Sequence, residues 1–200
     1  MSLPPPCLVA LASKSAIRAQ LLRQAGVAFA VVDSHADEEA LKAQLSGSPA
    51  QLAEGLAVAK AKGAIGLAAD TLVIGADQTL EFEGQLFDKA KTPEDALARL
   101  RAFRGQWHAL HSGFALVRDG AVVHSQVVSA RLKVREVTET WLQTYGSKAG
   151  AALTQCVGGY EFEGLGAQLF EQVDGDFHTI LGLPLLPLLS VLREHGGLAS

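Results

Sequence analysis

Residues 72–78 read LVIGADQ, a short apolar run that leads directly into a carboxylate and an amide. An unbroken apolar run of this length is typical of a strand that is buried on both faces of a sheet. The ends of such strands are where α/β proteins present ligands and reactive groups. Burying a bare carboxylate is costly, so Asp77 must be solvated, paired or bound to a cation. We therefore predict a functional site at Asp77, at the tip of this strand.

Segments with strand and helix periodicity alternate around this run. Apolar or β-rich runs predict strands at residues 8–11, 29–32, 72–76, 79–82, 85–87, 107–118 and 121–135. Caps and apolar periodicity predict helices from Ser13 or Ser15 to Gly26, Ser48 to Gly66, Thr92 to Phe103 and Thr138 to Tyr145, and a last one ending at His195. Turns at 83–84 and 119–120 predict hairpins. The pattern predicts an α/β fold with a mixed central sheet flanked by helices on both sides.

Composition and charge exclude one large function class. The 200 residues are 48% hydrophobic and 19% charged, which is enough to bury a core. The net charge of -4 leaves no basic stripe for a nucleic acid, so we expect no nucleic-acid partner. A small polyanion can still bind, because a local group of lysines outweighs a mild overall negative charge.

The sequence also predicts the cellular compartment of the chain. Residues 1–6 lack the basic region of a signal peptide, and no apolar run approaches the roughly 20 residues that span a bilayer. Cys7 and Cys156 have no metal-ligand spacing, and we interpret them as inert thiols in a reducing compartment. We therefore expect a cytoplasmic chain with no membrane partner. The sequence leaves a homodimer open and does not fix the oligomeric state.

Three segments away from the strand carry groups that bind phosphate. They are the turn with Ser13, Ser15 and Arg18, the helix with Lys60 and Lys62, and the loop with Lys89 and Lys91. Backbone N–H groups at a helix start, hydroxyls and cationic side chains all bind phosphate oxygens. Taken singly, helix capping explains the serines and a solvated surface explains the lysines. Together with the carboxylate of Asp77, they predict a site for a metal-bound polyphosphate.

Five stretches of the chain occur in the order and spacing of one protein family. They are LASKSAIR (11–18), DE (37–38), AKAK (59–62), GADQ (75–78), and CVGGY (156–160) leading to GLPL (182–185). This pattern resembles the Maf family of nucleotide pyrophosphatases over nearly the whole chain, and FRGQWH (103–108) with SG (112–113) is similar to a further strand of that family. The chain departs from the family at three places, each of which keeps the polar group. Ser15-Ala16 stands for Ser-Pro, Lys89-Ala90 for Lys-Pro, and Ser112-Gly113 for Thr-Gly.

The resemblance implies a fold, a reaction and roles for named residues. The fold would be a single domain over residues 1–200 with two lobes and a cleft, similar to inosine triphosphate pyrophosphatases. The chain would be an enzyme, a hydrolase that cleaves a nucleoside triphosphate between the α and β phosphates to give the monophosphate and pyrophosphate. Glu38 and Asp77 would hold a divalent cation, magnesium with manganese as the alternative, and Asp77 would be the catalytic residue that activates water. The phosphate-binding residues would be Ser13, Ser15, Arg18, Lys60 and Lys89.

Three positions at which branches of the family differ predict the base. Ile17, Gln78 and Glu163 resemble the 7-methyl-GTP pyrophosphatase branch, whereas the branch that hydrolyses UTP and dTTP carries arginine, threonine and glutamine there. A carboxylate at position 163 can accept from both donors of guanine and favours the positive charge of 7-methylguanine. We therefore expect 7-methyl-GTP or another modified guanine nucleotide. The alternatives are a dTTP/UTP pyrophosphatase, or a nucleotide-binding regulator of cell division with incidental turnover.

Overall fold

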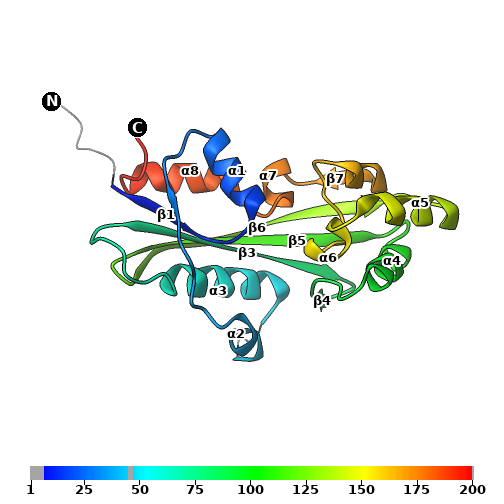
Figure 1. The fold of residues 1–200 in the computed structure, drawn as a ribbon, viewed down its shortest axis with the longest axis horizontal. Coiled ribbons are helices and arrows are strands. Elements are labelled where there is room, and N and C mark those ends of the chain that lie inside the picture. Colours follow the sequence, from blue (N-terminus) through cyan, green and yellow to red (C-terminus); the bar gives the residue numbers. More distant parts are fainter. Residues whose placement is uncertain (1–6, 45–46, 200) are drawn as a thin grey trace.

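One seven-stranded mixed sheet organises the computed structural model, which describes residues 7–44 and 47–199 (Figure 1). Its strands are β1 (Val9–Ala12), β2 (Ala30–Val31), β3 (Leu72–Phe82), β4 (Gln85–Phe87), β5 (Trp107–Arg118), β6 (Ala121–Val134) and β7 (Phe170–Asp174). The strand order is β2-β1-β3-β5-β6-β7, and β4 pairs with β3. β1 lies parallel to β2 and β3, and the other pairs are antiparallel. The predicted mixed α/β sheet is therefore confirmed.

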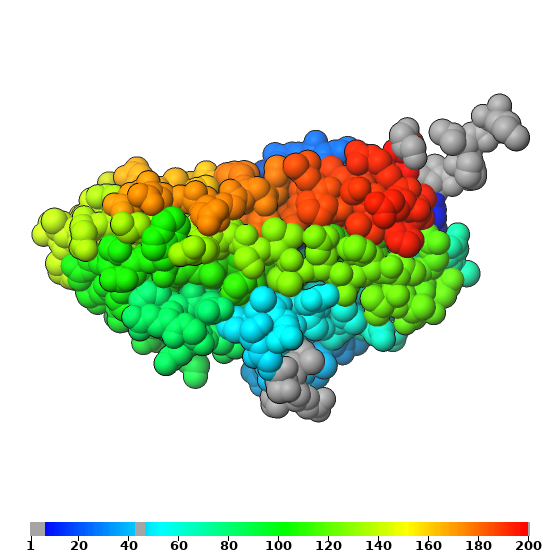
Figure 2. All heavy atoms as spheres, turned by 180° about the vertical axis from the view of Figure 1, so that it is seen from behind, coloured from blue at the N-terminus to red at the C-terminus, as the bar shows by residue number. Residues whose placement is uncertain are grey.

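Helices cover both faces of this sheet (Figure 1). They are α1 (Ala16–Gln24), α2 (Glu38–Gln44), α3 (Pro49–Lys62), α4 (Pro93–Ala102), α5 (Glu139–Ala149), α6 (Ala152–Gln155), α7 (Phe177–Ile180), α8 (Leu185–Glu194) and the 3-10 helix η1 (Leu165–Leu169). α1 and α8 lie on one face and α3 on the other. From behind, the C-terminal segments form a band on one side of β6, and α3 lies on the other side (Figure 2). Among the described residues, no helix is both long and apolar enough to cross a membrane.

Local sequence signals account for most of the element boundaries. Side chains of Ser15, Ser48, Thr92 and Thr138 cap the helices that the sequence places there. Both predicted hairpins form, and their turn residues adopt the positive φ that a tight hairpin turn requires. Other boundaries move: the strand predicted at 29–32 is only two residues long, α3 ends at Lys62 and α5 continues to Ala149. The segment 1–6, which lacks a signal-peptide pattern, lies outside the described residues.

Strand β3 is longer than the sequence indicates, and this changes the position of Asp77. The apolar run and the segment 79–82 form one continuous strand, so Asp77 lies in the middle of it and the predicted strand tip is wrong. The reason is long-range pairing, because β5 pairs with β3 from Leu72 to Glu81 and carries it past the acid.

The opposite edge of β3 has a gap. β1 pairs only with residues 72–75 and β4 only with residues 80–82. Residues 76–79 therefore have a strand neighbour on the β5 side alone. Asp77 and Gln78 lie in this gap, and their side chains point to opposite faces of the sheet because successive strand residues alternate.

Two apolar clusters support the two ends of β3. Leu72, Ile74 and Ala76 pack in a cluster that includes buried residues of α1 and α8. Leu80 and Phe82 pack in a second cluster, around residues of α4 and α5 such as Leu100. These two clusters hold β3 in place on both sides of the gap.

Helix α3 approaches the sheet so closely that the strands need glycine beneath it. A Cβ added to Gly75 would lie 2.0 Å from the carbonyl oxygen of Ala57, and one added to Gly113 would lie 2.5 Å from that of Ala53. A Ser48–Gln51 capping box fixes the start of the helix. This contact sets the height of α3 above β3, and with it the position of Lys60 near the end of the helix.

We expect Gly75→Ala to destabilise the protein by about 1–3 kcal/mol, because α3 must move away from the sheet. Urea unfolding followed by circular dichroism measures this loss. Gly164→Ala is the matched control, since the nearest atom to its added Cβ lies 3.8 Å away. Equal stability of the two variants would contradict the close packing of α3.

Candidate active site

A cleft of about 1260 Å³ opens at the gap in the edge of β3. This is above the roughly 300–1,000 Å³ common for small-molecule sites. All ten predicted site residues line it: Ser13, Ser15, Ile17, Arg18, Glu38, Lys60, Asp77, Gln78, Lys89 and Glu163. Lys91 lines the cleft too, whereas Lys62 lines a separate cavity of about 180 Å³. The fold thus brings segments far apart in the sequence into one site, while the role of each residue stays a prediction.

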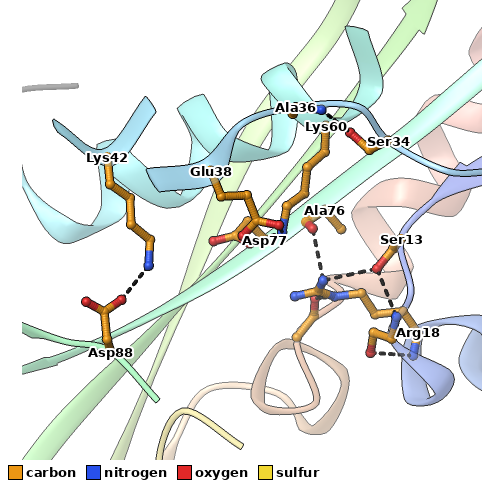
Figure 3. A network of polar contacts seen from close by, with 12 residues as sticks. Ser13, Arg18, Ser34, Ala36, Glu38, Lys42, Lys60, Ala76, Asp77 and Asp88 are labelled. Carbon is orange, nitrogen blue, oxygen red and sulfur yellow. Dashed lines mark hydrogen bonds and ion pairs between the residues drawn. The ribbon is translucent and has the colours of Figure 1, made fainter. Parts of the chain in front are cut away.

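The centre of the cleft is an ion-pair cluster from three elements (Figure 3). The Lys60 Nζ of α3 lies 2.6 Å from Asp77 Oδ1 on β3 and 3.1 Å from Glu38 Oε1 on α2. The side chains of Lys60 and Asp77 are only 13% and 12% exposed. Solvent screens the Lys60–Asp77 pair less than it screens surface pairs, so this pair joins α3 firmly to β3. The side chain of Glu38 is 51% exposed, so its link from α2 is weaker.

The donor set of this cluster suits a hard divalent cation. Carboxylate oxygens from Glu38 and Asp77 converge on one point, and magnesium is usually bound by one or two carboxylates together with phosphates of the substrate. Within residues 7–44 and 47–199, no group of three or more His, Cys, Asp or Glu side chains could hold a metal by itself. The residues therefore fit a cation that completes its coordination with substrate oxygens.

Arg18 donates hydrogen bonds to backbone carbonyls at the gap in the edge of β3 (Figure 3). Its Nη1 donates to the carbonyl of Ala76 at 2.9 Å and to Ser13 Oγ at 3.3 Å. Its Nε donates to the carbonyl of Gly182 at 2.8 Å. Burial lowers the pKa of Arg18, against the opposing effect of Asp77 and Glu38. Arg18 thus connects α1, β3 and the turn before α8, besides lining the cleft.

The two serines of the first turn keep donors for a ligand. Ser13 Oγ accepts from Arg18 and from the N–H of Ser15, and Ser15 Oγ accepts from the N–H of Arg18 as the cap of α1. Because both hydroxyls act as acceptors in these contacts, each O–H hydrogen can still be donated to an anion.

Gln78 is held on the other face of β3, toward α7. Its Nε2 lies 3.0 Å from Ser112 Oγ, 3.1 Å from the carbonyl of Thr179 and 3.0 Å from that of Ile180. Ser112 itself donates to the Thr179 carbonyl, so all three neighbours are acceptors toward the amide. They fix the orientation of the amide group, with its nitrogen bound to protein and its oxygen as the acceptor end.

Lys42 is a residue of the cleft that the sequence analysis missed. Its Nζ forms an ion pair with Asp88, in the loop after β4 (Figure 3). Burial lowers the pKa of Lys42, but the hydrogen bond and charge of Asp88, with smaller contributions from Asp77 and Glu38, raise it overall. Glu38 and Lys42 are four residues apart on α2, a spacing that places both on one helix face. This i, i+4 spacing was the sequence signal that could have identified Lys42.

Cys156 also lines the cleft, together with Tyr160, Phe162 and Glu163 from the segment that follows it. Burial, followed by the charges of Glu161 and Glu163, raises the pKa of the Cys156 thiol to about 11, while Lys89 acts in the other direction. These effects place acids and a lysine around the thiol. The wall thus combines aromatic surface with carboxylates.

Fold and cleft together define an α/β protein with a large cleft lined by paired acidic and basic side chains. The chain belongs to the Maf family, whose model, described as Maf-like protein, matches residues 8–195. It is 48% identical over 187 residues to a Maricaulis maris protein named nucleoside triphosphate pyrophosphatase, covering 93% of this chain and 95% of that protein. It is 43% identical to a Bartonella quintana protein named 7-methyl-GTP pyrophosphatase, with 93% and 94% covered. A solved structure titled as a HAM1 protein from Coxiella burnetii matches at 14% identity, covering 64% of this chain and 73% of that chain, with a TM-score of 0.36, too low to establish a common fold.

We expect Arg18→Lys to lower the free energy of unfolding by about 1–3 kcal/mol, although the charge is kept. The guanidinium of Arg18 donates from Nη1 to Ala76 and from Nε to Gly182. The single ammonium of a lysine cannot reproduce this geometry, so one of the two carbonyls loses its donor. Urea denaturation measures the loss. Arg23→Lys, at an exposed site on the same helix, should change stability by less than about 0.5 kcal/mol. Similar losses of unfolding free energy in the two variants would contradict a structural role for Arg18.

Proposed function

We propose that this chain is a nucleoside triphosphate pyrophosphatase, which hydrolyses the bond between the α and β phosphates and yields a nucleoside monophosphate and pyrophosphate. The observation that carries the proposal is that Glu38 and Asp77 both pair with the ammonium of Lys60, inside a cleft that further cationic side chains line. The cationic side chains of the lining are Lys14, Arg18, Lys42, Lys60, Lys89 and Lys91. A purely anion-binding site gains nothing from carboxylates at its centre, whereas a hydrolase for a metal-bound polyphosphate uses them. The names of the relatives support the same reaction.

The proposed mechanism assigns the reacting groups to Asp77 and the lysines. Asp77 accepts a proton from the attacking water, whose oxygen forms a bond to the α phosphorus while the bond to the bridging oxygen breaks. Pyrophosphate leaves with that bridging oxygen. Lys60 and Lys89 offset the charge that develops on the phosphates, and Ser13 and Ser15 donate hydrogen bonds. A magnesium or manganese ion held by Glu38 and Asp77 would neutralise further phosphate charge.

We further propose a guanine-type base, with 7-methyl-GTP as the preferred substrate. Gln78 offers an acceptor because its nitrogen is committed to protein, and Glu163 offers two more acceptors in the same cleft. Guanine presents two adjacent donors, and its 7-methyl form also carries a positive charge, so both features suit this set. Ile17 adds an apolar side chain nearby. The name of the Bartonella quintana relative supports the same choice.

The reaction is tested by pyrophosphate release from a panel of canonical and modified nucleoside triphosphates with magnesium. We expect release by the wild-type protein and a fall in kcat of about 10²-fold or more for Asp77→Asn, which keeps the shape and removes the base. Asp88→Asn is the matched control, because Asp88 lies in the same cleft and pairs with Lys42 instead. A near wild-type kcat for a folded Asp77→Asn variant would exclude Asp77 from the chemistry.

The base assignment is tested by kcat/KM on the same panel. We expect wild-type protein to favour 7-methyl-GTP, and Glu163→Gln to lose about tenfold or more on it, because a charge-assisted hydrogen bond is lost. Activity should shift toward pyrimidine triphosphates. Glu161→Gln, on the same wall of the cleft, should keep the wild-type order of substrates. A wild-type preference for UTP or dTTP would refute the guanine assignment.

A further inference from the structure

The ammonium group of Lys60 occupies the one position in the cleft on which both proposed metal ligands converge (Figure 3). Its distances to Asp77 Oδ1 and Glu38 Oε1 are 2.6 and 3.1 Å. A divalent cation that binds the same oxygens must therefore compete with a cation that belongs to the protein. The ammonium holds both carboxylates by opposite charge and by hydrogen bonds from its three donors, interactions that an incoming metal must break.

The surroundings of the two carboxylates add to this competition. Arg18 and Lys42 also experience the fields of Asp77 and Glu38, as the upward influence of both acids on the pKa of each base indicates. With Asp88, which pairs with Lys42, three negative charges are balanced by three positive ones before any ligand enters. The carboxylates are thus neutralised without a metal, and a dication that enters alone must displace Lys60 from them; the low exposure of Lys60 and Asp77 reduces the screening of this charge competition by solvent.

We propose that Lys60 makes divalent-cation binding conditional on the nucleotide, because its ammonium competes with the metal for Glu38 and Asp77 until phosphate oxygens offer it another partner. The inference rests on the proposed function for the identity of that partner, a triphosphate. The flexible four-carbon stem of lysine allows Nζ to turn from carboxylate to phosphate without movement of α3. One residue then serves both states of the site, as the counter-ion of the acids without substrate and of the phosphates with it.

Thermodynamic linkage gives this exchange a measurable form. If the triphosphate removes the competitor of the metal, the metal must strengthen triphosphate binding by the same factor. The metal and the nucleotide therefore bind together, and the site stays poorly loaded with free metal. Removing the Lys60 charge should weaken this coupling to the part that comes from direct contact between the metal and the phosphate oxygens.

The test measures Mn²⁺ binding by electron paramagnetic resonance on the full chain, without turnover. We expect weak Mn²⁺ binding to wild-type protein alone and tight binding once an α,β-methylene analogue of GTP is present. Lys60→Met should bind Mn²⁺ alone at least about tenfold more tightly than wild type, because a unit charge within a few Å of the metal is removed. Thermal unfolding verifies that each variant is folded.

Two control variants separate competition from a general change in charge. Lys62→Met removes the same charge from the same helix, but outside this cleft. Lys91→Met removes it inside the cleft, at a residue that the proposed mechanism does not use. Both should keep the weak Mn²⁺ binding of the wild type. The double variant Lys60→Met/Glu38→Gln should lose the gain, since one of the two carboxylates is gone.

The outcomes distinguish this inference from the proposed reaction. Unchanged Mn²⁺ affinity in Lys60→Met, or a gain that persists in the double variant, overturns the competition at Glu38 and Asp77 even when wild-type protein releases pyrophosphate. Conversely, a wild-type protein that releases no pyrophosphate from any triphosphate overturns the proposed function, while a gain in Lys60→Met still supports the competition.

Discussion

The gap in the edge of β3 is the constraint on which the site depends. A strand that pairs with β5 along its length, but with β1 and β4 only near its two ends, leaves four residues without a second neighbour. Their exposed backbone must find other donors, and Arg18 supplies one to Ala76. At the same gap, the side chains of Asp77 and Gln78 point to opposite faces of the sheet, so two adjacent residues contribute to the cleft from both faces.

Charge is organised locally in this protein and not over the whole chain. The overall charge is -4, yet the cleft lining carries as many lysine and arginine side chains as acidic ones. The acids of the lining are Glu38, Glu39, Asp77, Asp88, Glu161 and Glu163. Ion pairs across the cleft connect α2 to the loop after β4 and to Lys60 of α3, which pairs in turn with Asp77 on β3. A ligand that rearranges these pairs therefore also acts on the position of α2.

Sequence reasoning succeeded where the signal is local and failed where it depends on distant partners. Helix caps such as Ser48 and Thr92 are contained within a few residues, and each forms as predicted. The position of Asp77 within β3 depends on pairing with β5, more than thirty residues away, so the local apolar run gave a strand that was too short. β7, with the polar sequence FEQVD and a largely exposed surface, lacks the apolar alternation that identifies a strand. The ordered motifs located the cleft residues because motif order, unlike strand pairing, can be recognised in the sequence itself.

The raised pKa of Cys156 has a consequence for the chemical durability of the cleft. A thiol with a pKa of about 11 is almost entirely protonated at neutral pH, and only the thiolate reacts rapidly with peroxides, disulfides or alkylating agents. Burial of the sulfur, together with the acids around it, therefore disfavours its oxidation while it lies in the wall of the cleft. Cys156 is therefore expected to stay in its thiol form under conditions that oxidise cysteines of ordinary pKa.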